Sequence, residues 1–239
     1  MVKNTPIRRL FPQKKRRNRA EARSQIVEKN PAQRFFDSLD PANRRALFTI
    51  YSSYKKGSTH TMEKGCIQLY YGDGKGKTTA AMGQIVRCVG HGMKVLVYQF
   101  LKEPNSGEVE VIRNLPGVEY IANEGQIPFL FNLTPEQQAH FREQWGKVWE
   151  VVKEKYYSGE YDLVVLDEVI DAYNLGTIDK EDLHAVMDNR PQGTELVITG
   201  HQYGMDLSEL FKRADYVTKM VKEKHPFDEG MPCRKGIEE

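Results

Sequence analysis

Cysteine is scarce in this sequence of 239 residues: Cys66, Cys88 and Cys233 lie far apart, and none belongs to a C-x-x-C pair. A disulfide framework needs an even set of cysteines, and a zinc ribbon needs closely spaced pairs. Both are therefore excluded. Because Cys66 and Cys88 stand in apolar runs, we expect them to pack in the core. So few cysteines suit a reducing compartment, and we expect the protein in the cytoplasm.

Long apolar runs are also missing. No stretch approaches the ~18 residues that a membrane-spanning helix needs, so we expect no membrane role. The first twenty residues lack the apolar segment of a secretory signal, and their lysine–arginine block and scarcity of serine argue against a mitochondrial presequence. A composition of 39% hydrophobic and 28% charged residues is that of a globular protein able to bury a sizeable core.

Acidic residues are rare at the N-terminal end. Residues 1–60 contain 15 basic and 4 acidic residues, a net charge of +11, whereas the remainder contains 20 and 29, a net charge of −9. Residues 1–30 are too polar to form a core, which predicts a flexible basic arm. Such an arm is most often a solvated tail, although clustered lysine and arginine also suit a phosphate backbone. The acidic remainder lacks the aromatic–basic interleaving that stacks single-stranded nucleic acid, which argues against that partner.

Residues 40–55 begin with an Asp-Pro helix signal and carry apolar side chains at helical spacing, which predicts a short amphipathic helix. A polar linker follows. We therefore expect an N-terminal extension over residues 1–64 and one domain over residues 65–239.

Apolar runs alternate with helix-like runs from residue 65 onward. The expected strands are residues 66–71, 94–100, 118–122, 162–168, 195–200 and 216–221. Several of them are apolar throughout, which is typical of strands buried on both faces of a parallel sheet. A helix is expected over residues 77–89, and the run Thr134-Pro135-Glu136-Gln137 forms a capping box that begins a long helix. The pattern predicts a doubly wound α/β fold whose mainly parallel sheet has five or six strands.

A glycine-rich loop connects the first expected strand to the first expected helix. Such a loop directs several backbone N–H groups, and the positive end of a helix, at a bound anion. Lys77 adds a full charge, and the Thr78 hydroxyl can bind a Mg²⁺ that bridges phosphates. The pattern G-x-x-x-x-G-K-[ST] is shifted here, because Tyr71 stands in its first position. The residues expected to bind nucleotide phosphates are Gly72, Asp73, Gly74, Lys75, Gly76, Lys77, Thr78 and Thr79.

Two carboxylates end the apolar run LVVLDE: Asp167 and Glu168. Parallel strands deliver such residues to the sheet edge where the glycine loop also lies. A P-loop site needs an acid there to hold Mg²⁺ directly or through water, and either residue suits this role. An acid at a strand end can also simply cap the next helix. A kinase or an ATP-driven motor would carry the same two motifs, so they do not decide the reaction.

The last residues, VKEKHPFDEGMPCRKGIEE, read together with GDGKGKTTAAMG and LVVLDEV, resemble the P-loop family of ATP:corrinoid adenosyltransferases. The similarity covers residues 65–239. It rests on K-H-x-F-D-x-G, followed by a G-I-[DE] ending, in a chain that opens with G-x-G-K-G-K-T-T. The resemblance implies a RecA-like P-loop fold, ATP and a reduced corrinoid as substrates, and Mg²⁺. It also implies a flavoprotein reductant, a homodimer, and an N-terminal segment over the corrinoid site.

The resemblance implies an unusual use of the loop. Co(I) of the corrinoid attacks C5′ of the ATP ribose, and triphosphate leaves intact. Lys77, Thr78 and Glu168 would then be catalytic by stabilising the leaving group, with Thr78, Glu168 and Asp167 on the metal side.

Four further residues are assigned to the corrinoid by the same resemblance. Phe129 and Phe131 follow the third strand, where family members use Phe-x-Trp to displace the lower axial ligand. Two aromatic side chains in a loop can also simply anchor that loop in the core. His225 and Asp228, in the terminal motif, would shape the site. His201 stands where the family more often has arginine, and a histidine is only partly charged near neutral pH.

The sequence also leaves two alternative functions open. A P-loop ATPase that acts on nucleic acid through the basic arm would hydrolyse ATP to ADP. A non-catalytic corrinoid or ATP sensor would keep the fold, but binding alone does not require Lys77, Thr78 and the acid pair.

Overall fold

The computed structural model describes residue 40 and residues 62–103, 106–123 and 134–238. The chain divides into two units, and all of these residues except Asp40 belong to the unit Ser52–Glu239. The basic arm and nearly all of the helix expected over residues 40–55 lie outside the described residues. Both stay predictions, as does a domain boundary after residue 64.

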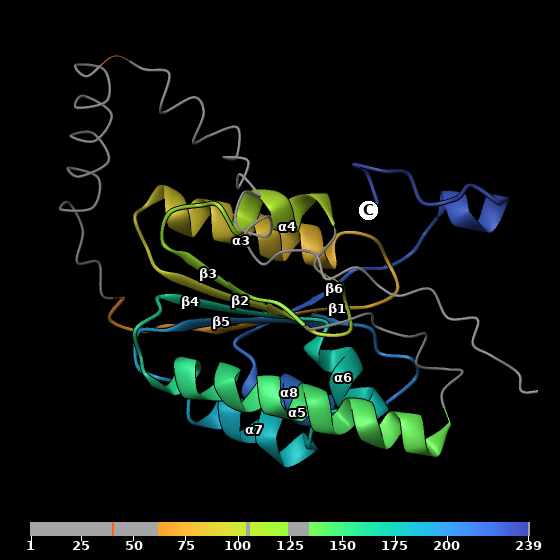
Figure 1. Ribbon diagram of the computed structural model, residues 1–239. Helices are drawn as coiled ribbons and strands as arrows, with labels where there is room; N and C mark the ends of the chain where they lie inside the picture. The colour runs from red at the N-terminus through yellow and green to blue at the C-terminus, as the bar shows by residue number, and fades with distance from the viewer. Residues whose placement is uncertain (1–39, 41–61, 104–105, 124–133, 239) are drawn as a thin grey trace, which may run out of the picture. The chain divides into compact units, whose positions relative to one another are not determined.

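Six parallel strands form one sheet in the order β3-β2-β4-β5-β1-β6 (Figure 1). The strands are β1 Ile67–Tyr71, β2 Val95–Gln99, β3 Val118–Ile121, β4 Leu163–Asp167, β5 Glu195–Gly200 and β6 Tyr216–Lys219. Every one lies within a stretch expected to be a strand, so the α/β fold with a parallel sheet is confirmed. β5 lies between β1, which leads into the glycine loop, and β4, which ends in Asp167.

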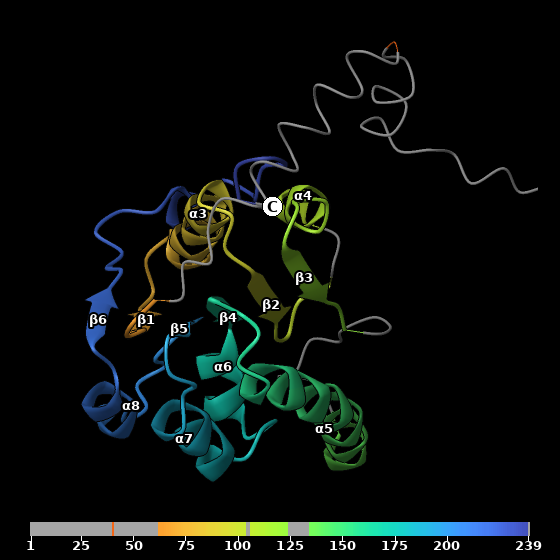
Figure 2. The same ribbon diagram turned by 90° about the vertical axis from the view of Figure 1, so that its left-hand side faces the viewer.

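Helices cover both faces of the sheet (Figure 2). On one face lie α3 Lys77–Gly90 and α4 Gly107–Ile112; on the other lie α5 Pro135–Tyr157, α6 Val169–Leu175, α7 Lys180–Asp188 and α8 Ser208–Arg213. A 3₁₀ turn, η3 Pro226–Glu229, follows β6. Among the described helices, none has both the length and the apolar character needed to cross a membrane.

The two faces of the sheet form two separate cores, because successive side chains of a strand point to opposite faces. Val97 of β2 packs in the cluster that contains Ile85 of α3. Its neighbour Leu96 packs in the cluster that contains Trp149 of α5. β2 and β4 are buried along their whole length, as their continuous apolar runs predict. Cys88 is buried in the first of these cores, whereas Cys66 is half-buried.

The start of α5 follows its expected capping box. The Gln137 N–H donates to Thr134 Oγ1 at 3.3 Å, and the Thr134 N–H donates to Gln137 Oε1 at 3.0 Å. These bonds satisfy backbone donors that a helix start otherwise leaves unpaired. The helix then runs antiparallel to the strands and returns the chain to the start of β4.

Candidate active site

The glycine loop lies between the end of β1 and the start of α3, at the carboxyl edge of the sheet. Gly72 and Gly76 have φ values of +117° and +119°, a region that side chains with a Cβ rarely adopt. A Cβ on Gly72 would also lie 2.2 Å from the backbone oxygen of Met220, and one on Gly74 would lie 2.7 Å from that of Val221. The glycines therefore let the chain after β6 run directly against the loop. The Gly74 N–H donates to Met220 O at 2.9 Å, which joins the two sequence motifs.

Lys77 begins α3 and is buried. Its ammonium donates to the backbone oxygens of Gly72 at 2.7 Å and Gly74 at 3.1 Å, so it lies across the loop. Burial lowers the pKa of Lys77, and the negative charges of Asp171 and Glu168 partly oppose that effect. The lysine is thus held by neutral acceptors that it can exchange for the oxygens of a phosphate.

Asp167, the last residue of β4, has no exposed surface. Its Oδ1 accepts a hydrogen bond from the Thr78 hydroxyl at 3.0 Å and from the Thr199 hydroxyl at 2.6 Å. Its Oδ2 accepts one from Gln99 Nε2 at 3.0 Å. Burial alone would raise the pKa of Asp167, but the ammonium of Lys102 and the hydrogen bonds from Thr199 and Gln99 together hold the pKa below its usual value. Asp167 is therefore an ionised acid directed at the first turn of α3.

Glu168 takes a different position. Its backbone is left-handed (φ +60°), and its N–H donates to Thr199 Oγ1 at 2.9 Å as the chain turns into α6. Burial raises the pKa of Glu168 to about 7; the Lys102 ammonium opposes this rise, and the negative charges of Asp167 and Asp171 add to it. The structure thus separates the two acids that the sequence could not: Asp167 is the one hydrogen-bonded to Thr78.

Lys102, which sequence reasoning missed, lies between these groups. Its ammonium is 2.9 Å from the Thr78 hydroxyl oxygen and 2.9 Å from Asp167 Oδ2. It is also 3.0 Å from Glu168 Oε1. The available signal was its place just beyond β2, because polar residues that follow a central parallel strand lie at the same sheet edge.

The oxygen donors gathered here suit Mg²⁺. Mg²⁺ prefers hydroxyl and carboxylate oxygens and usually takes few of them from the protein, since phosphates and water complete its shell. Thr78, Asp167 and Glu168 provide such donors. Within the described residues no group of three or more His, Cys, Asp or Glu side chains is arranged to hold a metal alone. The residues therefore fit a metal that binds together with a nucleotide.

The terminal motif lies beside the loop. The Lys222 N–H donates to Asp73 Oδ1 at 3.3 Å, while the Lys222 ammonium pairs with Asp228 at 3.0 Å. His225 precedes η3 as its N-cap, and its Nδ1 accepts from the Phe227 N–H at 3.2 Å. Asp228 is therefore linked to the loop through Lys222, whereas the His225 side chain caps the 3₁₀ turn that follows it.

An open cavity of about 510 Å³ lies next to the loop. Lys75, Thr78, Thr79 and Lys102 line one part of it, and residues 236–238 line another. The Lys75 ammonium donates to Ile237 O at 2.7 Å. Four of the polar side chains expected or found at the site thus face one hollow.

His201 follows β5 and is held by a buried acid, Asp171. The backbone N–H of His201 donates to Asp171 Oδ2 at 2.9 Å, and the ring Nδ1 of His201 lies 3.0 Å from Asp171 Oδ1. A Cβ on Gly200 would lie 2.4 Å from Asp171 Oδ2, so this approach requires glycine. The remaining candidates, Phe129 and Phe131, lie outside the described residues, and their assignment stays a prediction.

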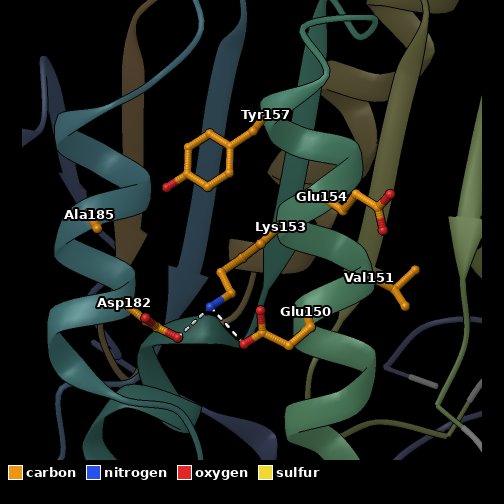
Figure 3. Close-up of a pocket in the computed structure, with 7 residues that line it drawn as sticks. All are labelled: Glu150, Val151, Lys153, Glu154, Tyr157, Asp182 and Ala185. Carbon is orange, nitrogen blue, oxygen red and sulfur yellow. Dashed lines mark hydrogen bonds and ion pairs between the residues drawn. The ribbon is translucent and has the colours of Figure 1, made fainter.

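A second cavity of about 510 Å³ lies between α5 and α7 (Figure 3). Lys153 bridges the two helices there, with its ammonium 2.8 Å from Glu150 Oε1 and 2.7 Å from Asp182 Oδ2. None of its lining residues belongs to the glycine loop, the acid pair or the terminal motif. The loop edge is therefore the candidate active site.

Comparison with known proteins identifies the family. Residues 63–238 match the family described as ATP:corrinoid adenosyltransferase BtuR/CobO/CobP. The chain belongs to this family. Its match to the ATP:corrinoid adenosyltransferases confirms the resemblance seen in the loop and terminal motifs, and with it the class of transferases. The basic arm lies outside the matched residues.

Curated relatives agree with this assignment. The corrinoid adenosyltransferase of Sinorhizobium sp. is 36% identical over 186 residues, which cover 76% of this chain and 83% of that protein. Those of Pseudomonas aeruginosa and Escherichia coli are each 34% identical and cover 74% of this chain. The aligned parts are 84% and 86% of those two proteins.

Proposed function

We propose that this chain transfers the 5′-deoxyadenosyl group of ATP to the Co(I) of a reduced corrinoid and releases triphosphate, in adenosylcobalamin biosynthesis or salvage. The observation that carries the proposal is the Thr78–Asp167 hydrogen bond at the end of a left-handed glycine loop, in a chain of this family. The family match favours this reaction over an ATPase that acts on nucleic acid.

The loop binds the triphosphate. The Gly74 N–H is bonded to Met220 O, so the other backbone N–H groups of residues 73–79 and the positive end of α3 would donate to the phosphates. Lys77 exchanges its bonds to Gly72 and Gly74 for phosphate oxygens. An electron pair of Co(I) forms the bond to C5′, and the C5′–O bond breaks with its electron pair moving to the triphosphate. Negative charge grows on that leaving group, so these donors stabilise the transition state more than the bound substrate.

Thr78 and Asp167 would hold Mg²⁺, with Glu168 beside them. The ion, when bound, would neutralise part of the charge on the triphosphate. Asp167 also fixes the Thr78 hydroxyl, and Gln99 and Thr199 fix Asp167, so the oxygen donors are oriented before the nucleotide arrives.

The corrinoid side of the site rests on the resemblance. Phe129 and Phe131 would exclude the lower axial ligand, and His225 and Asp228 would shape the pocket. A flavoprotein donor, a homodimer and a cytoplasmic location belong to the same proposal.

One assay tests the reaction. The protein is mixed anaerobically with ATP, Mg²⁺ and a chemically reduced corrinoid, and both products are measured. We expect a light-sensitive adenosylcorrinoid and triphosphate in equal amounts. Formation of ADP and phosphate with an unchanged corrinoid spectrum would show that the proposal is wrong.

A further inference from the structure

Lys102 contacts the same three oxygens that are proposed to face the metal. The ammonium lies at 2.9–3.0 Å from Thr78 Oγ1, Asp167 Oδ2 and Glu168 Oε1. Its side chain is 27% exposed, against 0% for Asp167 and 22% for Glu168. A cation is thus held between two carboxylates and a hydroxyl, at the place where a P-loop site holds Mg²⁺.

The backbone is shaped to place this lysine. The Phe100 N–H donates to Asp167 O at 2.8 Å, and Leu101 then turns with φ +51°, which is uncommon for a leucine. The buried Asn123 side chain donates to Gln99 O at 2.8 Å and to Lys102 O at 3.1 Å, so it clamps both ends of the turn. Strained turns held by such contacts are concentrated at functional sites.

An ammonium and a divalent cation cannot share these oxygens. Mg²⁺ binds oxygen at about 2.1 Å and requires an octahedral shell, so an ammonium on the same atoms occupies that shell. Like charges a few ångströms apart also repel strongly in a partly buried site. The Lys102 ammonium is paired with the carboxylates of both Asp167 and Glu168, at 2.9 and 3.0 Å.

We propose that Lys102 is the counter-ion of the nucleotide-free site: its ammonium takes the place of the divalent cation on Thr78, Asp167 and Glu168, and leaves when metal and ATP bind. The inference rests on the proposed metal site. Lys102 also lines the cavity that contains Lys75 and Thr79, so the released ammonium has a triphosphate within reach of its flexible side chain. The lysine would therefore suppress metal binding in the absence of nucleotide and would make metal and ATP bind cooperatively.

The test is the affinity of the full chain for Mn²⁺ without nucleotide, measured at pH 8 by electron paramagnetic resonance of the free ion. We expect weak binding by the wild type and at least tenfold tighter binding by Lys102→Met. Lys75→Met is the matched control: it removes a lysine from the same cavity whose ammonium is bonded to Ile237 O, and we expect its affinity to change less than twofold. Adding Asp167→Asn to Lys102→Met should abolish the gain.

Several outcomes would overturn the inference. Equal Mn²⁺ affinity of the wild type and Lys102→Met would do so, because a lysine that merely supports the structure has no reason to compete with the ion. An equal gain in Mn²⁺ affinity by Lys75→Met would also do so, because the effect would then come from the overall charge of the cavity and not from Lys102. If Lys102→Met fails to fold by circular dichroism, Lys102→Gln replaces it with the same expectation. If the wild type adenosylates corrinoid but Lys102→Met shows no gain in Mn²⁺ affinity, this inference alone is refuted. If Lys102→Met gains Mn²⁺ affinity but the wild type does not adenosylate corrinoid, the proposed function alone is refuted.

Discussion

The Thr78 hydroxyl donates a hydrogen bond to Asp167 Oδ1 at 3.0 Å, which joins the first turn of α3 to the end of β4. The two residues are 89 positions apart in the chain. In the sheet, β5 separates β4 from β1, the strand that leads into the loop and α3. The contact brings the phosphate loop and the acid into one site, and it selects Asp167 over Glu168 as the partner of Thr78.

Replacing Lys77 with alanine should reduce adenosyl transfer on the order of 10²-fold or more, because a buried donor to the leaving triphosphate is lost. Adenosylcorrinoid formation, followed spectrophotometrically under anaerobic conditions, measures the effect. Lys147→Ala is the control, since that lysine is exposed on α5 and pairs only weakly with Glu143 at the surface. Activity of Lys77→Ala within a few fold of the wild type would contradict the role given to the loop.

Gly72→Ala should destabilise the fold by roughly 1–3 kcal/mol and should weaken ATP binding, because the Cβ meets Met220 O and φ is +117°. The matched control is Gly83→Ala on α3, where a Cβ has no neighbouring atom within 4 Å. That change should be neutral or stabilising by about 0.5–1 kcal/mol, as expected for a glycine in a helix. Urea unfolding measures both, and equal effects of the two changes would argue against the tight contact between the loop and the chain after β6.

The fold and the loop could be predicted from the sequence because their signals are local. Continuous apolar runs mark β2 and β4, a capping box marks α5, and glycines followed by Lys77 and Thr78 mark the loop. The strand predicted over residues 216–221 ends earlier, at Lys219, in the structure. Residues 220 and 221 follow the glycine loop instead, and Met220 O accepts a hydrogen bond from the Gly74 N–H.

Lys102 and Asp171 had no motif of this kind, and Lys102 had only its place just beyond β2 as a signal. The left-handed Leu101 places Lys102 at the site. Asp171 lies on α6, and its carboxylate approaches the backbone at Gly200 because that residue has no side chain. A single charged residue beyond a strand or on a short helix resembles an ordinary surface residue in sequence. Its burial, and its partners 30 or more residues away, appear only in three dimensions.

Glu168 should make stability depend on pH. Its pKa rises from the usual 4.5 to about 7 in the folded protein, so between these values the folded state holds a proton that the unfolded state has lost. The contribution of Glu168 to the free energy of unfolding therefore falls as pH rises from about 4.5 to 7, by up to about 3 kcal/mol. Glu168→Gln removes this dependence, so the variant should gain on the wild type between pH 5 and 8. Thermal unfolding with a chelator present measures the gain, and parallel curves for the two proteins would refute it.

Asp228 provides a test of the terminal motif that separates structure from function. Its pair with Lys222 is exposed, so Asp228→Asn should leave the melting temperature nearly unchanged. If Asp228 shapes the corrinoid site, the KM for the corrinoid should rise several fold while the KM for ATP stays the same. Glu229→Gln is the matched control, because Glu229 is the next residue and makes a similarly exposed pair with Lys224. Equal corrinoid KM values for both variants and the wild type would remove Asp228 from the site, and a rise in the KM for ATP would instead place its effect on the loop through Lys222 and Asp73.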